Sequence, residues 1–405
     1  MNKKNISLLI VRKSSVEIDW ILPVIERMKK NTNFFTLFLN YEAYLSLKKS
    51  TFLYKKWKSI SKEFYVQKKI DNIFYKLLRK IIDKFFYNKK LPLYRKIRNK
   101  LDNKIHNISF LKKKLKINDF ENFHFILNEF QKTSYWSNKI ISHNKKTKLF
   151  LFPHTTHIYK YDKSKLKNTH NTPKKCDAIF IGSMHDKKIW QNRMEREKIF
   201  ITGHPKYDKD WQKQFIEKIK NRKKIIFAIK NVIDQSSRKL TVIYMEKLYD
   251  ICKKFNYLLV LKLPPFIQEE LNLIINNFKK NKTKKHYIIS SKNIFTSLNG
   301  ARLLINFNQS ATTLDAFYKK VPVIQLPSIN KLKNKFNKND SIYTKLNFAF
   351  KVNDIGILEK KIRTILVNQS SLKLNKNNSR LKYLSIQKES SKLIEKIILN
   401  KIKYS

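Results

Sequence analysis

Residues 300–327 read GARLLINFNQSATTLDAFYKKVPVIQLP, and this stretch decides the fold class of the chain. Arg302 to Ile305 is a short apolar run, as expected of a strand that is buried on both faces of a sheet. A polar break follows at Asn306 to Ser310, then a helix with an apolar stripe, and then a second strand at Val321 to Leu326. This order of strand, loop, helix and strand is typical of an α/β domain.

Three hydroxyl side chains, those of Ser310, Thr312 and Thr313, stand where the predicted helix begins. A polar loop that leads into a helix offers free backbone N–H groups and the positive end of the helix dipole, which together bind phosphate. Ser310 or Thr312 would equally serve to cap the helix, as Ser and Thr do in many proteins. The sequence leaves both interpretations open.

Length and charge set the broad class of the protein. A chain of 405 residues is too long for one ordinary core, so two domains are expected. The formal net charge of +58 points to polyanions, which are nucleic acid, an anionic membrane surface or phosphorylated substrates. The chain is also rich in Lys, Asn and Ile and has only four Gly, which suggests an A·T-rich coding bias. Charge alone therefore selects no partner.

Cysteine usage and hydropathy indicate a reduced, cytoplasmic chain. Cys176 and Cys252 match no zinc-ligand spacing, and Cys252 lies on an apolar helical stripe that predicts a core position. The apolar run at Ser7 to Val11 is too short for a signal peptide, and no segment approaches the ~20 apolar residues of a membrane span. Any contact with the inner face of a membrane is expected to be peripheral.

The first half of the chain alternates strands with helices, which predicts a Rossmann-like domain over residues 1–205. A helical insertion is expected at about 64–116. The predicted strands are Ser7–Val11, Phe34–Leu39, Phe125–Leu127, Leu149–Phe152, Ala178–Ile181 and Ile199–Thr202.

Within the insertion, residues 64–88 predict a basic amphipathic helix, because apolar residues recur there at helical spacing and lysines fill the other face. Such a helix can lie in the surface of an anionic bilayer. An ordinary surface helix packed on a core has the same pattern. Both interpretations are kept.

Histidines follow three successive strands of the first half, where open α/β sheets bind ligands. They lie in the loops Pro153 to His157, Gly182 to His185 and Gly203 to Pro205. At least one of these loops is a candidate lining of a site, with candidate residues His154, His157, Ser183, His185, Gly203 and His204. No carboxylate or Cys follows at ligand spacing, so zinc is not expected.

The second half predicts another doubly wound domain. Residues 206–222 are polar and charged and predict a linker, and Asp208-Lys209-Asp210 within it is interpreted as solvated charge. Five strands with intervening helices follow over residues 223–370, and a helix is predicted within 371–405. There is no GxGxxG and no P-loop, so dinucleotide binding and ATP hydrolysis have no motif behind them.

Three stretches carry a family resemblance. They are CDAIFIGSMHDKKIW (176–190) followed by EKIFITGHPKYD (197–208), YLLVLKLPP (257–265) and ARLLINFNQSATTLDAFYKKVPVIQL (301–326). Together they resemble the GT-B, or two-Rossmann-domain, glycosyltransferases of bacterial surface polysaccharides, namely CDP-glycerol glycerophosphotransferases and capsule and Kdo transferases, and the related UDP-GlcNAc 2-epimerases. Where the family pattern reads Lys-x-His-Pro, this chain has Pro264 in place of the His.

The resemblance implies a donor site on the second domain. Carried over position by position, it places Lys262 on the diphosphate, Asn231 on the cleft floor and Asp315 near the ribose or in the same helix turn. It places Ser310, Thr312 and Thr313 on the donor phosphates. The donor would be a CMP-, CDP- or UDP-linked sugar or polyol, with no cofactor and no metal, and the acceptor a saccharide or a lipid-linked saccharide.

Such an enzyme needs a base in the first domain to deprotonate the acceptor hydroxyl. His154 is the first candidate, and His157, His185, Glu17 and Asp19 are the alternatives.

Two rival functions remain. A UDP-GlcNAc 2-epimerase would share the fold, and a nucleic-acid-binding protein would account for the charge, although most aromatic residues fall on apolar stripes rather than among lysines.

Overall fold

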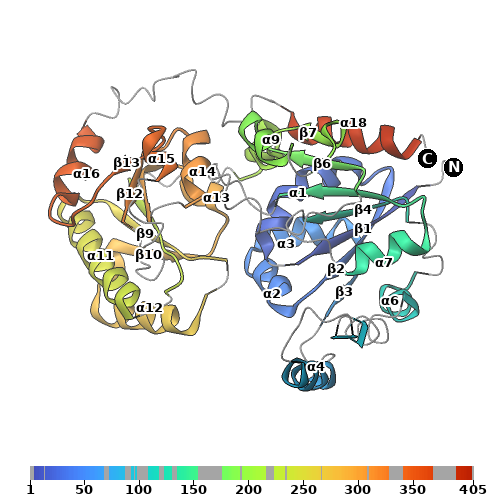
Figure 1. The fold of residues 1–405 in the computed structure, drawn as a ribbon. Coiled ribbons are helices and arrows are strands. Elements are labelled where there is room, and N and C mark those ends of the chain that lie inside the picture. The colour runs from blue at the N-terminus through green and yellow to red at the C-terminus, as the bar shows by residue number, and fades with distance from the viewer. Residues whose placement is uncertain are drawn as a thin grey trace.

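The computed structural model describes residues 4–12, 14–67, 73–86, 93–94, 96–97, 108–117, 123–129, 135–153, 176–191, 194–215, 223–232, 235–265, 267–307, 310–327, 341–367 and 389–403. These residues form two α/β domains that lie side by side (Figure 1). Each domain is built on one sheet, and every strand pair in both sheets is parallel.

The described part of the first domain has a seven-stranded sheet in the order β3-β2-β1-β4-β5-β6-β7. Its elements are β1 Asn5–Val11, α1 Ser15–Met28, β2 Thr32–Phe38, α2 Tyr41–Lys49, α3 Thr51–Lys58, β3 Ser61–Val66, α4 Ile73–Phe85, α6 Ile108–Leu115, β4 Phe125–Glu129, α7 Tyr135–His143, β5 Lys148–Phe152, β6 Ala178–Ile181, α9 Met184–Trp190, the 3₁₀ turn η3 Arg196–Lys198 and β7 Ile199–Ile201.

The described part of the second domain has a six-stranded sheet in the order β10-β9-β8-β11-β12-β13. Its elements are β8 Lys224–Ala228, α11 Gln235–Lys254, β9 Leu258–Lys262, α12 Glu269–Asn281, η5 Lys284–His286, β10 Tyr287–Ser290, α13 Ile294–Leu298, β11 Ala301–Phe307, α14 Thr312–Tyr318, β12 Val323–Leu326, α15 Ile342–Lys345, β13 Phe350–Lys351 and α16 Leu358–Val367. Between the domains lie η4 Pro205–Tyr207 and α10 Lys209–Lys213, and α18 Ser390–Lys403 comes last.

Both sheets are doubly wound. In each, the first three strands run outward to one edge and the fourth pairs with the first on its other side, so the strand order reverses at β1/β4 and at β8/β11. The carboxyl ends of the strands at such a reversal are where open α/β sheets bind ligands. Two Rossmann-like domains of this kind confirm the fold class predicted from the sequence.

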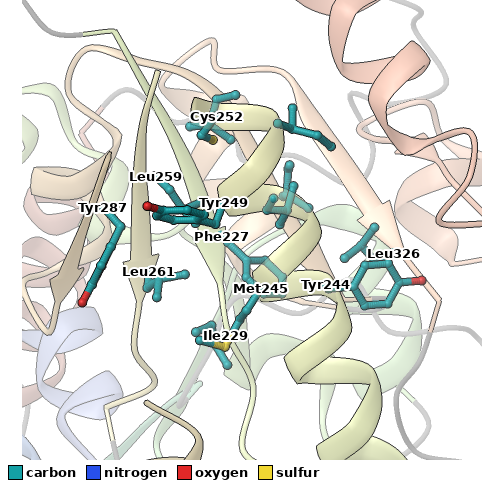
Figure 2. Packing of buried hydrophobic residues seen from close by; sticks show 14 of the residues in the cluster. Phe227, Ile229, Tyr244, Met245, Tyr249, Cys252, Leu259, Leu261, Tyr287 and Leu326 are labelled. Carbon is teal, nitrogen blue, oxygen red and sulfur yellow. The ribbon is translucent and has the colours of Figure 1, made fainter. Parts of the chain in front are cut away.

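The strands are apolar because helices cover both faces of each sheet. In the second domain α11 packs on the sheet through Tyr244, Met245 and Tyr249, which meet Phe227 and Leu261 of the strands (Figure 2). Cys252 lies in the same cluster with none of its surface exposed, so its predicted core position is confirmed.

Three elements between β2 and α4 depart from the sequence expectation. Helices α2 and α3 were not predicted, and β3 occupies residues 61–66, so the first residues of the helix predicted at 64–88 belong to a strand. Strand β3 is an edge strand that exposes Lys62, and α4 is described from Ile73.

The segment after the first sheet is not a simple polar linker. Trp211 and Phe215 are buried in the core of the first domain, and Ile394 and Ile398 of α18 join the same cluster, since α18 packs on α1. Asp208 is buried, and its carboxylate accepts from the backbone N–H groups of Ser390 and Ser391 at 2.8 Å each. The interpretation of Asp208 as solvated charge is therefore wrong, because this carboxylate caps α18.

Candidate functional site

A cavity of about 310 Å³ lies between the two domains. On the first domain it is lined by residues that follow β1 and β2 and by Lys206 of η4. On the second it is lined by residues at the carboxyl ends of β8, β9, β10 and β11. Its polar lining on the described residues is Ser15, Asp19, Ser46, Lys49, Ser50, Lys206, Lys230, Asn231, Lys262, Ser291, Lys292, Asn293, Ser310, Thr312 and Asp315. Five of these side chains are lysines and two are aspartates, so the described lining favours an anionic ligand.

Lys262 is the last residue of β9 and is nearly buried in the cavity wall. Its Nζ donates to the backbone carbonyl of Leu263 at 2.6 Å. Burial lowers the pKa of the Lys262 ammonium to about 8, and the negative charge of Asp315 works against that change. A bound diphosphate would supply the counter-charge that this ammonium has only in part.

Ser310 and Thr312 line the cavity where α14 begins. The Ser310 hydroxyl lies 2.9 Å from Thr312 Oγ1, and Thr312 Oγ1 also accepts from the amide of Asn306 at 2.9 Å. The residue at the capping position is Ala311, and no side chain caps α14. The capping interpretation of Ser310 and Thr312 is therefore wrong for this helix.

Thr313 does not line the cavity, in contrast to its two predicted partners. Its side chain is fully buried, and Oγ1 accepts from the amides of Asn306 at 3.0 Å and Gln325 at 2.8 Å. The helix turn points this hydroxyl into the domain, so the structure does not place Thr313 on a donor phosphate. Asn231 does line the cavity, where its Oδ1 accepts from the backbone N–H of Gln268 at 3.3 Å.

Asp315 lines the cavity, and its carboxylate is already paired. Its Oδ1 accepts from Lys206 Nζ at 2.6 Å and from the Tyr207 hydroxyl at 2.9 Å. Both partners come from η4, the turn that joins the domains, and the two charged side chains are nearly buried. Asp315 therefore connects α14 of the second domain to η4 of the inter-domain segment.

The first-domain wall of the cavity is the amino-terminal part of α1, which Ser14 caps, together with the end of α2 and the start of α3. Asp19 lies there, and its Oδ1 accepts from the amide of Asn293, on the second domain, at 3.2 Å. Burial raises the pKa of Asp19 to about 6. Lys206 lowers this pKa and Asp315 raises it further. A carboxylate with such a pKa is ionised at neutral pH and can accept a proton.

His204 lies near the inter-domain turn but outside the cavity lining. Trp20 Nε1 donates to its Nδ1 at 3.1 Å, and a Cβ added to Gly182 would lie only 1.9 Å from its Nε2. Burial, with the charge of Lys206, lowers the pKa of His204 to about 3. His204 is thus a neutral packing residue, and Gly203 beside it takes a left-handed backbone conformation with φ 79°.

Ser183 and His185 also lie outside the cavity lining. The Ser183 hydroxyl caps α9 by accepting from the backbone N–H of Asp186 at 3.3 Å, and it donates to the Asp186 carboxylate at 3.0 Å. His185 is buried in the first turn of α9. The other two predicted catalytic residues, His154 and His157, fall outside the described residues.

Two residues of the site were missed or ranked low from the sequence: Lys206 was placed in the predicted linker at 206–222, and Asp19 was an alternative to His154 as the base. The signal for Asp19 was its place one turn into the helix that follows β1, at the reversal point of the sheet. Lys206 lies within the stretch 197–208 that carries the family resemblance, but its ion pair with Asp315 had no sequence signal. Among the described residues, no group of three or more His, Cys, Asp or Glu side chains is arranged to hold a metal ion.

No protein-family model matches the chain, and no curated protein matches it in sequence. Solved structures are similar over nearly its whole length. A putative UDP-N-acetylglucosamine 2-epimerase from Listeria monocytogenes has a TM-score of 0.61 and 11% identity, covering 100% of this chain and 98% of that one. The UDP-GlcNAc 2-epimerase from Methanocaldococcus jannaschii, in complex with UDP-GlcNAc and UDP, has a TM-score of 0.56 and 14% identity, covering 97% and 99%.

The wall teichoic acid polymerase TagF is similar with a TM-score of 0.56 and 12% identity, covering 99% of this chain and 90% of that one. At such identities the likeness shows the fold alone. The chain has the GT-B fold, in which two Rossmann-like domains face a cleft, as the sequence resemblance led us to expect.

Proposed function

We propose that the chain is a glycosyltransferase, or a glycerophosphotransferase-like enzyme, that moves a sugar or polyol phosphate from a nucleotide-activated donor to a hydroxyl of a saccharide or lipid-linked acceptor. The observation that carries the proposal is the inter-domain cavity, in which Lys262, Ser310 and Thr312 of the second domain share one space with Asp19 of the first. Surface polysaccharide synthesis, such as that of capsule or lipopolysaccharide, is the setting that the sequence resemblance favours.

In this proposal the second-domain wall holds the donor. The Lys262 ammonium pairs with the diphosphate, and the hydroxyls of Ser310 and Thr312 hydrogen-bond to its oxygens. As the bond to the leaving nucleotide breaks, negative charge grows on its phosphate oxygens, and Lys262 stabilises that charge inside a site with little water. The donor is a CMP-, CDP- or UDP-linked compound, and no cofactor or metal takes part.

Asp19 is the candidate base, because it is the one proposed base that the described residues place in the cavity lining. It takes the proton of the acceptor hydroxyl while the acceptor oxygen bonds to the transferred group and the nucleotide leaves with the electron pair of the broken bond. His154 remains the alternative base. It comes two residues after the end of β5, a strand of the same sheet as β1.

The reaction is tested by incubating the protein with a panel of CMP-, CDP- and UDP-linked sugars and polyols and following nucleotide release by chromatography. We expect slow hydrolysis of one donor class, faster release when a saccharide acceptor is added, and no effect of EDTA. A panel in which no nucleotide is released, with or without acceptor, contradicts the transferase proposal. Loss of activity in EDTA contradicts its metal-independent form.

A second candidate is epimerisation of a UDP-linked amino sugar. The similarity in fold to UDP-GlcNAc 2-epimerases supports it, and Asp19 in the cavity is one of the acid–base groups that moving a proton on and off carbon needs. Proton NMR of a UDP-GlcNAc incubation separates the two functions: epimerisation gives the C2 epimer with the nucleotide still attached, whereas transfer releases UDP.

Tight binding of oligonucleotides with weak nucleotide binding would instead favour a nucleic-acid-binding protein.

A further inference from the structure

Helix α4 exposes part of its apolar face. Leu77, Ile81 and Phe85 recur every four residues, so they share one face of the helix, and 55%, 48% and 82% of their surfaces are exposed. Lys80 and Lys84 are exposed on the same face between them. A surface helix packed on a core would bury such a stripe. The ordinary interpretation of this helix accounts for Leu78 and Ile82, which are half-buried, but it leaves these three exposed side chains unexplained.

The position of α4 is suited to binding a partner outside the chain. None of its described side chains belongs to the hydrophobic clusters of the two domains. Figure 1 shows α4 below β3, the edge strand of the first sheet, and outside the layers that cover that sheet. Phe86 lies 5.8 Å from Tyr94, ring centre to ring centre, so the segment with exposed Leu93 and Lys96 adjoins the end of α4.

We propose that this face, made by Leu77, Lys80, Ile81, Lys84 and Phe85, docks on the surface of an anionic phospholipid bilayer. The apolar side chains enter the boundary between headgroups and acyl chains, and the two lysines pair with lipid phosphates beside them. In the described part of the chain no helix is long and apolar enough to cross a membrane, so this contact would be peripheral. The inference does not rest on the proposed reaction.

Other occupants fit the face less well. A second copy of the chain would bring Lys80 and Lys84 against their own counterparts as water is excluded, in a molecule that already carries a formal charge of +58. Nucleic acid would pair with the lysines but leave three large apolar side chains in water. An anionic bilayer satisfies the charge and the apolar surface together.

The test is co-sedimentation of the full chain with phosphatidylcholine vesicles that contain, or lack, phosphatidylglycerol. We expect binding to the anionic vesicles only. Leu77→Ser/Ile81→Ser/Phe85→Ser and Lys80→Glu/Lys84→Glu should each weaken the partition at least tenfold, because each removes one of the two contributions. Since all five side chains are exposed, both variants should keep the circular dichroism spectrum and Tm of the native chain.

Matched controls lie on the second domain. Ile243→Ser/Leu273→Ser removes exposed apolar side chains of α11 and α12, and Lys279→Glu/Lys280→Glu reverses exposed charges of α12. Both controls should bind vesicles as the native chain does. The proposal is overturned if the native chain stays in the supernatant, if the controls lose as much binding as the α4 variants, or if the α4 variants lose self-association or oligonucleotide binding while keeping the vesicles. Nucleotide affinity, measured in parallel, should stay unchanged in the α4 variants.

Discussion

Lys206 Nζ lies 2.6 Å from Asp315 Oδ1, and both side chains are nearly buried between the two domains. The lysine belongs to the turn that joins the domains and the aspartate to α14, whose start lines the cavity. The Tyr207 hydroxyl donates to the same carboxylate oxygen. The pair therefore links the geometry of the candidate donor site to the inter-domain segment.

Breaking this pair from one side should destabilise the protein strongly. Asp315→Asn leaves the Lys206 ammonium buried without its counter-charge, at an expected cost of about 3–5 kcal/mol in the free energy of unfolding. The double variant Lys206→Met/Asp315→Leu removes both charges of the pair. Its free energy of unfolding should therefore be far closer to that of the native chain. Urea titrations of the single and double variants measure this. Equal losses in Asp315→Asn and the double variant would show that the charges do not act as a pair.

Lys262→Met should make the protein more stable. Because burial lowers the pKa of Lys262 from 10.5 to about 8, the protonated side chain costs folding free energy below that pH, by up to about 3 kcal/mol. The native chain should regain this stability as pH rises from about 8 towards 10.5, so the advantage of the variant should shrink in alkali. Thermal melts at neutral and alkaline pH test both statements. If Lys262→Met has a lower Tm than the native chain at neutral pH, the conclusion that the buried Lys262 ammonium costs stability is contradicted.

The pH dependence of turnover should be bell-shaped. Asp19 must be ionised to accept a proton, so kcat/KM should rise as pH passes about 6. Lys262 must be charged to hold the diphosphate, so kcat/KM should fall as pH passes about 8. Asp19→Asn should lower kcat by about 10²–10⁴-fold above pH 6, and the deficit should shrink at lower pH, where Asp19 of the native chain is itself protonated. If Asp19→Asn keeps near-normal turnover and His154→Ala loses it, the base is His154.

Gly182→Ala should destabilise the first domain. The new methyl group would lie 1.9 Å from Nε2 of His204, a buried ring that Trp20 holds by a hydrogen bond. Overpacking of this kind costs about 1–3 kcal/mol. Gly182→Ala/His204→Ala should recover part of the loss, since the smaller side chain makes room. Thermal melts of the two variants provide the measurement, and a native Tm for Gly182→Ala would contradict the packing described here.

Much of the fold could be predicted because it depends on local patterns. The unit from β11 to β12 was located within two residues at each boundary, since apolar runs and helical spacing mark buried strands and amphipathic helices. Strand β3 was not predicted. It lies at a sheet edge with only Ser61 and Tyr65 buried, so its sequence carries little apolar signal.

The candidate site could be predicted only in part, because side-chain direction and burial depend on distant contacts. Ser310 and Thr313 both stand at the helix start, yet one lines the cavity and the other faces Gln325 inside the domain. Lys206 was placed in a polar linker and Asp208 was interpreted as solvated charge, yet each meets a buried partner more than a hundred residues away. Such partners have no sequence signal.

We propose that the inter-domain cavity binds a nucleoside diphosphate, and calorimetry with UDP and CDP measures this binding. At least one of the two nucleotides should bind saturably to the native chain. Lys262→Met should weaken that binding by about 1.5–3 kcal/mol, while Lys279→Met, which changes an exposed lysine on α12, should leave it unchanged. If neither nucleotide binds, or if Lys262→Met binds as tightly as the native chain, the claim is contradicted.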